Sequence, residues 1–576
     1  MSLALVTPFS GSRVGSLRNT FPRHGFPVTG NKSSLTFRCS LTTIDLMQNI
    51  KEKINDSLET AIVHIPSNLC VIDTLQRLGP DRYFQSEIDT ILESTYMLWQ
   101  QKHKIMFSNV TTHAMAFRLL RVKGYEISSE ELAPYDNQDG VSQQTVDVAM
   151  VIELYRAAHE RIDEEERCLV NILGWTTTFL NHQLHSKSIP DKKLHKLVEF
   201  YMNNYHGIPI RLGVRRNLDL YDMSHYQALR LKTRFSNICN EDFVALAMQD
   251  FTICQAQYHK ELQQLQRWYA DCRLDTLKFG RQVVFISYFL ASLVIDDCAT
   301  SAHARLAFTK TTVLATLIDD FFDYGGSRKE CYNILELVND FLLVHHLYNE
   351  QNRWKEKASA EYESMEVEII FTALYNTVNE LAVMASVAQG RSTKEFIVGM
   401  WVEVVSSFKV ELDAWSNGSQ QSLDEYMSTS WLSVSGKIVV LMALLFIGVK
   451  LSDEMLMSEE CTDLSRHVSI IIRLINDVCS FEKERKENKG NNCMSILLAD
   501  GRGITEEEAI AEIKEIVENH RRKLMQIVYT KGTILPRRCR DIFVETCKAA
   551  SYVYTSSDEF TTPQKLKEDM KSFLGL

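Results

Sequence analysis

Proline and glycine are scarce along this chain, whose 576 residues include 10 prolines and 23 glycines. Apolar residues recur three and four positions apart almost throughout, which is the spacing of one face of an α-helix. Proline and glycine are the residues that most often interrupt a helix, so long helices with few breaks are expected. The sequence therefore predicts an all-α protein.

The length predicts more than one hydrophobic core, because single cores stop growing at about 250 to 300 residues. Composition changes near Leu262 to Arg281, where longer and more apolar helices begin. We predict an N-terminal helical domain over residues 45–270 and a C-terminal domain over residues 271–576.

Residues 1–44 differ from the rest of the chain. They contain seven serines, four arginines and one lysine, and the first acidic residue is Asp45. This composition is typical of an organelle transit peptide. A disordered tail without a targeting role is the alternative interpretation.

The bulk composition argues against several classes of protein. A net charge of −11 disfavours nucleic acids and anionic membranes as partners. The longest apolar runs, Ile438 to Val449 and Val283 to Ile295, are shorter than the about 20 residues of a membrane-spanning helix. The 13 cysteines lack the regular spacing of a disulfide framework, which favours a reducing compartment.

Three aspartates, Asp319, Asp320 and Asp323, follow a strongly apolar stretch in the C-terminal half. On a helix, residues 319 and 323 project from the same face, where two carboxylates repel each other. Mg²⁺ would relieve that repulsion, because it binds hard oxygen ligands and is held by one or two carboxylates together with substrate phosphates. A solvated acidic helix end is the alternative, which the neighbouring phenylalanines disfavour.

A second group of oxygen-bearing side chains lies about 150 residues later. Asn476, Ser480 and Glu484 are spaced i, i+4 and i+8, so they form one helical stripe. Arg473 lies one turn earlier and is placed to bind a phosphate. Alone, this stripe is equally well explained as a polar helix surface.

Together, the two groups predict a clamp for a diphosphate held through several Mg²⁺ ions. Neutralising the charge that develops on the diphosphate is the main way to lower the barrier to cleavage of its C–O bond. Asp319, Asp323 and Arg473 are accordingly the predicted catalytic residues.

The motifs DDxxD at 319–323 and NDxxSxxxE at 476–484 resemble the two metal motifs of plant class I terpene synthases. Three N-terminal segments, 75–79, 114–124 and 267–269, are similar to the kaurene-synthase-like diterpene synthases of mint-family plants that lack the γ domain. The resemblance implies a βα architecture, in which the α domain is catalytic and the β domain is a silent α/α barrel. It also implies about three Mg²⁺ ions and a plastid location.

Class II cyclases of this family protonate an alkene with an Asp-x-Asp-Asp motif, which is absent here; Asp296-Asp297 lacks the first aspartate. The resemblance then implies a bicyclic labdane-type substrate, copalyl diphosphate or its 8-hydroxy form, supplied by a class II diterpene cyclase. Abietane-, labdane- and kaurane-type products remain open. Acyclic geranylgeranyl diphosphate is the alternative substrate.

By similarity, the segment 431–437 matches a helix break beside the reacting cation. We therefore expect Val434 and Ser435 to control the product, with an apolar Val434 favouring an olefin and Ser435 able to hold a water for an alcohol. Trp401 is a candidate aromatic wall, because aromatic faces stabilise cations.

Two features depart from the family pattern. An Arg-x-Arg diphosphate-binding motif is reduced to Arg281, with Val283 in the second position. The segment 339–353, which contains His345 and His346, is longer than its counterpart in the family. A prenyltransferase and a non-catalytic helical scaffold are the competing hypotheses, but neither explains the Asn476, Ser480 and Glu484 stripe beside an aspartate motif.

Overall fold

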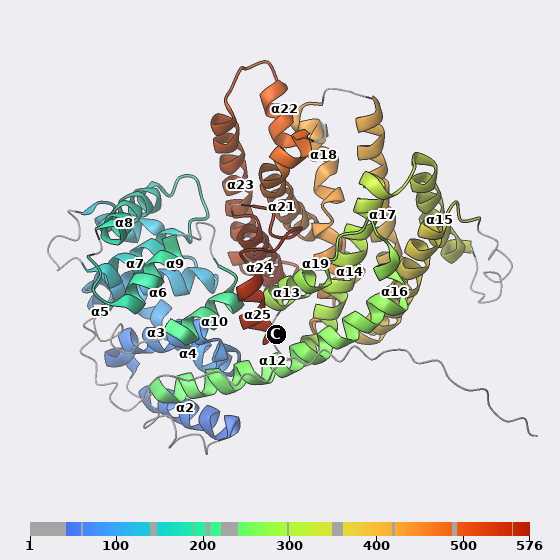
Figure 1. Cartoon of the computed structure of the whole chain (residues 1–576). Coiled ribbons are helices and arrows are strands. Elements are labelled where there is room, and N and C mark those ends of the chain that lie inside the picture. The colour runs from blue at the N-terminus through green and yellow to red at the C-terminus, as the bar shows by residue number, and fades with distance from the viewer. Residues whose placement is uncertain are drawn as a thin grey trace, which may run out of the picture.

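The computed structural model describes residues 42–58, 61–138, 147–186, 188–202, 208–220, 240–295, 299–347, 361–417, 421–486, 492–555 and 557–576. Within these ranges the regular elements are all helices, and no strand is present. The prediction of an all-α protein is therefore confirmed. Figure 1 shows a group of shorter N-terminal helices beside a taller C-terminal bundle.

The N-terminal helices pack around one apolar core that extends from Leu46 to Ala247. Many of them begin with a side-chain cap; Asn109, for example, accepts a hydrogen bond from the backbone N–H of Thr112. The helices are α2 (Thr43–Leu58), α3 (Ala61–Leu78), η1 (Pro80–Tyr83), α4 (Gln85–Gln100), α5 (Lys104–Phe107), α6 (Val110–Val122), η2 (Ser129–Tyr135), α7 (Val148–Ala158), α8 (Arg167–His185), α9 (Lys192–Met202) and α10 (Ile210–Leu220).

The C-terminal helices surround a second, larger core. They are η4 (Leu274–Thr276), α13 (Val284–Val294), η5 (Ala299–Ser301), α14 (Ala302–Asp320), η6 (Phe321–Gly325), α15 (Arg328–Leu347), α16 (Met365–Gln389), α17 (Lys394–Asn417), α18 (Leu423–Ser433), α19 (Gly436–Leu444), α20 (Asp453–Leu456), α21 (Glu459–Lys486), α22 (Cys493–Ala499), α23 (Glu506–Tyr529), α24 (Arg537–Val553) and α25 (Lys567–Leu574).

Helix α12 (Asn240–Asp271) is 32 residues long and joins the two halves. In Figure 1 it runs along the base of the molecule, from beside α2 to the foot of the C-terminal bundle. Its Phe243, Leu246 and Ala247 belong to the N-terminal core, whereas its buried residues from Phe251 onward belong to the C-terminal core. Helix α12 thus passes from the N-terminal core to the C-terminal core between Ala247 and Phe251, about 20 residues before the predicted domain junction at 270–271. The position of that junction stays a prediction.

A buried ion pair fixes α12 to the helix that carries the first aspartates. Glu261 of α12 accepts hydrogen bonds from Arg305 of α14, at 2.6 and 2.9 Å, and from the Tyr288 hydroxyl of α13 at 2.9 Å. Arg305 and Glu261 are 0 % and 1 % exposed. Because charges at such depth are tolerated only when they are paired, this contact specifies the register of α12 against α14.

One stretch of the described residues, Leu423–Leu444, is long and apolar enough to cross a membrane by length and composition, but 67 % of its apolar window is buried inside the protein. It comprises α18 and α19 with a break between them, as expected of core helices. Residues 339–347 of the long 339–353 segment form the end of α15, and the remainder lies outside the described residues.

Candidate functional site

The first two aspartates end α14, and the third follows in a π-helical turn. Asp319 and Asp320 are its last residues, and the turn Phe321–Gly325 contains Asp323. The Gly326 N–H donates to the Phe321 carbonyl at 2.8 Å, an i→i+5 bond. Asp319 and Asp323 were predicted to share one face on the assumption of regular α-helical geometry, from which this turn departs. Single π-helical turns inside helices are rare and occur frequently at functional sites.

Arg281 lies against this aspartate cluster. Its backbone N–H and Nε each donate to Asp320 at 2.7 Å, and its Nη2 donates to Asp319 at 2.9 Å. Burial, and then the nearby Asp323 carboxylate, raise the pKa of Asp319 to about 8. Burial also raises the pKa of Asp320. In the described structure, Arg281 is thus the cation that offsets these two carboxylates.

Helix α21 carries the second group. It is continuous from Glu459 to Lys486, so Asn476, Ser480 and Glu484 lie along one face. Glu484 accepts a hydrogen bond from Asn492 Nδ2 at 2.9 Å. Burial raises the pKa of Glu484, and the charge of Asp477 adds to the rise.

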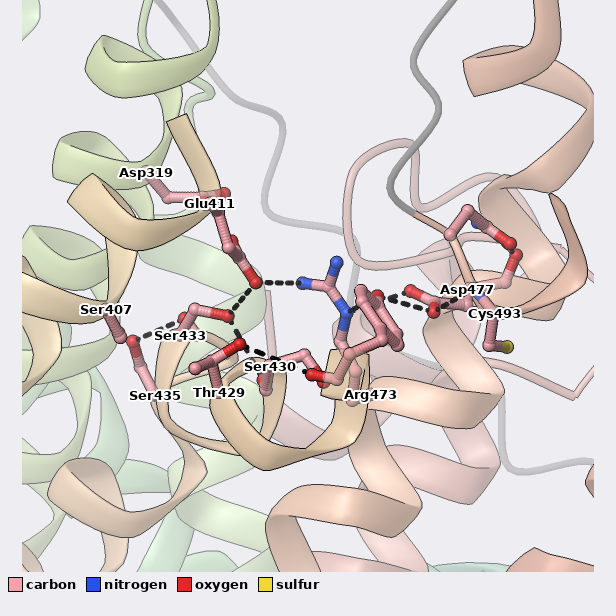
Figure 2. Close-up of polar contacts among 12 residues, drawn as sticks. Asp319, Ser407, Glu411, Thr429, Ser430, Ser433, Ser435, Arg473, Asp477 and Cys493 are labelled. Atoms are coloured by element: carbon pink, nitrogen blue, oxygen red, sulfur yellow. Dashed lines mark hydrogen bonds and ion pairs between the residues drawn. The ribbon is translucent and has the colours of Figure 1, made fainter. Parts of the chain in front are cut away.

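Arg473 is held in place by a buried polar network, shown in Figure 2. Its Nε donates to the Tyr426 hydroxyl at 2.5 Å and lies 3.0 Å from Asp477 Oδ1. Tyr426 and the backbone N–H of Cys493 donate to Asp477 Oδ2, at 2.7 and 2.9 Å. Asp477 is only 1 % exposed, so it anchors Arg473 from behind the face that carries Asn476.

Glu411 of α17 is a site residue that the sequence interpretation missed. It accepts a hydrogen bond from the Ser433 hydroxyl at 2.5 Å and lies 3.9 Å from Arg473 Nη1. Figure 2 shows it between Asp319 and Arg473. Burial raises its pKa. No sequence motif marks Glu411, although it lines the polar compartment together with Phe408.

Two adjoining cavities bring these residues together. One, the polar compartment, has a volume of about 320 Å³, and the other, the apolar compartment, about 170 Å³. The polar compartment is lined by Phe279, Arg281, Asp319, Asp320, Phe322, Asp323, Tyr324, Phe408, Glu411, Leu412, Arg473, Asn476, Ser480, Lys483, Glu484, Asp558 and Thr561. The apolar compartment is lined by Arg281, Leu290, Val294, Phe308, Thr312, Ala315, Thr316, Asp319, Ser433, Val434, Ser435, Gly436, Val439, Ile472, Arg473, Asn476, Thr546, Ala549, Ala550, Val553, Tyr554 and Phe560.

Four residues line both compartments: Arg281, Asp319, Arg473 and Asn476. All four were predicted as site residues from the sequence. Two come from the aspartate side of the site and two from α21. The boundary between the polar and apolar compartments is therefore formed by two arginines, a carboxylate and an amide.

The break between α18 and α19 forms one wall of the apolar compartment. Val434 and Ser435, for which the sequence analysis predicted control of the product, line it. Helix α18 is started by a capping box in which Ser422 and Glu425 bond reciprocally. It ends at Ser433, and Ser435 has the left-handed backbone angles φ 61° and ψ 11°. Gly436 is required next, because a Cβ there would lie 2.8 Å from Ser469 Oγ.

The predicted aromatic wall differs from the observed one. Trp401 is 2 % exposed inside the C-terminal core and is not among the described residues that line either compartment. The aromatic side chains that do line the apolar compartment are Phe308, Tyr554 and Phe560. Tyr554 and Phe560 come from the C-terminal end of the chain, which carries none of the motifs found in the sequence.

The donors of the polar compartment fit a hard divalent cation. Six carboxylates line it (residues 319, 320, 323, 411, 484 and 558) against three cationic side chains (residues 281, 473 and 483), so negative charge is in excess. In the described part of the chain, no three Asp, Glu, His or Cys side chains converge on one point. Separated oxygen donors suit Mg²⁺, which keeps waters and shares its ligands with substrate phosphates.

Comparison with known proteins gives two domain matches. Residues 270–523 match the family described as "Terpene synthase family, metal binding domain". Residues 29–202 match the one described as "Terpene synthase, N-terminal domain". The matched metal-binding region includes Asp319 to Asp323 and Asn476 to Glu484.

Individual relatives align over the whole chain. The chain is 62 % identical to the chloroplastic sclareol synthase of Salvia sclarea, with 100 % of both chains covered. It is 58 % identical to a chloroplastic miltiradiene synthase of Isodon rubescens, covering 100 % of this chain and 92 % of that one. Among solved structures, isoprene synthase of grey poplar, in complex with three Mg²⁺ ions and dimethylallyl-S-thiolodiphosphate, has a TM-score of 0.79 at 21 % identity and covers 94 % of this chain and 98 % of that chain.

Proposed function

Because the chain belongs to the terpene synthase family, we propose that it is a class I diterpene synthase acting on a labdane-type bicyclic C20 diphosphate. Copalyl diphosphate and its 8-hydroxy form are the proposed substrates. The sclareol synthase and the miltiradiene synthase named above are labdane-type diterpene synthases, which supports this size class.

The junction of the two compartments is the observation that carries the proposal. A prenyl diphosphate has a highly charged head and an apolar tail, and the cavity pair offers a matching division. Arg281, Asp319, Arg473 and Asn476 surround the point where head and tail would join. The C–O bond that breaks on ionisation is the bond at that point.

The family's metal-binding domain supports the use of a divalent metal, and we propose three Mg²⁺ ions, as in the isoprene synthase complex. Asp319, Asp320 and Asp323 would supply ligands on one side, with Asn476, Ser480 and Glu484 on the other. Glu411 adds a carboxylate between them. Bound Mg²⁺ would neutralise the negative charge of the diphosphate as it leaves.

The two arginines have different environments and so different roles. Arg473 is fixed by Tyr426 and Asp477, and it presents a preorganised guanidinium to the phosphates. Arg281 is paired with Asp319 and Asp320. With Mg²⁺ held by those carboxylates, Arg281 would be available to bind the diphosphate.

The apolar compartment excludes water from the substrate cation and offers the ring faces of its aromatic lining. Val434 and Ser435 are proposed to direct the final step, towards deprotonation or capture of a water. The sequence lacks the aspartate motif for protonation-initiated cyclisation, so we propose that a class II cyclase supplies the bicyclic substrate. Residues 1–44 are proposed to direct the chain to the plastid, where the named relatives belong.

The proposal is tested by incubating the full-length chain and Mg²⁺ with normal and ent-copalyl diphosphate, 8-hydroxycopalyl diphosphate and geranylgeranyl diphosphate. Products are identified by gas chromatography and mass spectrometry. We expect a diterpene from at least one bicyclic substrate. Turnover of only geranylgeranyl diphosphate would favour the acyclic alternative. Chain elongation on added isopentenyl diphosphate would indicate a prenyltransferase, and no product from any substrate would contradict the proposal.

A further inference from the structure

The α18–α19 break contains a strained residue whose conformation is imposed from outside. Ser435 adopts φ 61°, a region that side chains other than glycine, asparagine and aspartate rarely occupy. Such a conformation persists only where the surrounding structure over-determines it. Because Val434 and Ser435 line the apolar compartment, the contacts that hold the break also fix the shape of that wall.

Helix α17 holds the break on both sides of Ser435. Before it, the Ser433 hydroxyl donates to Glu411 at 2.5 Å. After it, Lys437 Nζ donates to the two carboxylate oxygens of Glu403 at 2.7 and 3.0 Å. The two glutamates are eight residues apart, so they lie along one side of α17.

A third contact ties the two ends of the break directly to each other. Lys437, which follows the break, places Nζ 5.7 Å from the ring centroid of Trp431, which precedes it. Arg466 of α21 lies 5.2 Å from the same ring, and the indole is 7 % exposed. Cation–π contacts of this kind strengthen as the ring is desolvated.

Glu403 and Lys437 lie outside both compartments. They line a surface groove with Met400, Leu441 and Leu456, and neither is among the residues that line the polar or apolar compartment. Substrate therefore does not touch them. Within the α18–α19 break, their contacts act on the backbone that places Val434 and Ser435 in the apolar compartment.

We propose that the Lys437–Glu403 pair, acting with Trp431, is a positioning device that fixes the α18–α19 break and so determines which diterpene the enzyme releases. This inference rests on the proposed diterpene synthase function. The pair is partly exposed, with side-chain exposures of 22 % and 37 %, so it is a weak contact. A weak contact is sufficient, because a tenfold change in the ratio of two products needs a difference of only about 1.4 kcal/mol between competing barriers.

The test compares Lys437→Met, Glu403→Gln and the double variant in the full-length chain with Mg²⁺ and the bicyclic diphosphate that the wild type converts. The measured quantity is the ratio of the two most abundant diterpenes. We expect each single variant to change it by about threefold or more. The double variant should change it no further than Lys437→Met does, because that substitution already removes the contact with Glu403 as well as the one with Trp431. Lys437→Arg, which keeps the charge, should stay close to the wild-type ratio.

Lys310→Met is the matched control. Lys310 contacts Glu380 at 2.7 Å and lies 5.5 Å from the Trp268 ring, so it repeats the chemistry of Lys437 but joins α14 to α16, away from the break. It should leave the product ratio unchanged. If Lys437→Met loses its helical circular dichroism, the wild type in about 0.5 M KCl gives the same test, since salt screens partly exposed pairs. Its ratio should then move towards that of Glu403→Gln.

Unchanged ratios in the single variants would overturn the inference, as would effects that add in the double variant. These outcomes leave the proposed function standing, because diterpene is still made. Absence of any diterpene from the wild type would overturn both.

Discussion

Asp319 lines both compartments and accepts a hydrogen bond from Arg281, so its substitution tests the proposed site directly. Asp319→Ala removes a proposed metal ligand and leaves Arg281 without one of its two carboxylates. We expect kcat/KM to fall by about a hundredfold or more, because a ligand to a catalytic metal contributes several kcal/mol. Far-UV circular dichroism should not change. Asp413→Ala is the control, because Asp413 is a part-exposed carboxylate of α17 that contacts Tyr332 and Lys409 and lines neither compartment. Retained turnover in Asp319→Ala would show that the metal site is misplaced.

Gly436 is the second residue whose substitution has a defined outcome. An added Cβ would lie 2.8 Å from Ser469 Oγ and 3.3 Å from Ile472 Cδ1, so these two side chains would have to shift or α19 would have to move away from α21. Overpacking of this kind costs about 1 to 3 kcal/mol of unfolding free energy. Gly399→Ala is the matched comparison: it is also helical but has no atom within 4 Å of the added Cβ, and it should stabilise by up to about 1 kcal/mol. Thermal denaturation distinguishes the two, and equal melting temperatures would contradict the assigned contact.

At the scale of elements, site residues that share the face of one regular helix could be predicted from the sequence. Features that depend on local helix distortion or on packing between helices could not. The stripe of Asn476, Ser480 and Glu484 was predictable because α21 is an unbroken helix. The π-helical turn around Asp323 was not, since an i→i+5 bond has no signature in residue spacing. Glu411 was missed for a related reason. Its role follows from how α17 packs against α18 and brings Glu411 close to Arg473 of α21, which no local pattern encodes.

The contact between α21 and α23 makes stability depend on pH. His467 and His520 face each other with their Nδ1 atoms 2.8 Å apart. Burial, with Lys523 and Arg466 nearby, lowers the pKa of both to about 4, and His467 adds to the lowering of the His520 pKa. A histidine whose pKa is lowered by folding binds more protons when unfolded, so stability is present above the unfolded pKa and is lost as pH falls towards 4.

We therefore expect His520→Gln to reduce the stability lost between pH 7 and pH 5 by about 1 kcal/mol, after allowance for partial exposure. Chemical denaturation at the two pH values measures this loss. His113→Gln provides an independent comparison, because burial lowers the pKa of His113 to about 4 in the N-terminal core, away from this contact. An unchanged difference in His520→Gln would show that the pair does not titrate as described.

At the scale of the whole molecule, helix α12 packs in both halves and connects the helices of the active site to the N-terminal half. Helix α12 passes from one core to the other, and Glu261 fixes it to α14 through Arg305. A second link is formed by Arg216 of α10, which donates to Asp569 of α25 at 2.7 Å. Among the residues that the structure describes, none from the N-terminal half lines either compartment. Its observed contacts with the C-terminal half are structural ones, such as Arg216 with Asp569.

A domain junction at residues 270–271, predicted from the change in composition, would separate α12 from the C-terminal core, in which its residues from Phe251 onward are buried. Its second half contributes seven buried side chains to the C-terminal core: Phe251, Cys254, Tyr258, Leu262, Leu265, Trp268 and Tyr269. Burying one large apolar side chain is worth about 1.5 to 3 kcal/mol, so losing this set costs about 10 kcal/mol or more. That is comparable with the total stability of a domain. We expect a fragment of residues 271–576 to lack a cooperative thermal transition, whereas a fragment of residues 240–576 should unfold cooperatively. Equal cooperativity of the two fragments would show that α12 is dispensable to the C-terminal core and that the junction at 270–271 is a true boundary.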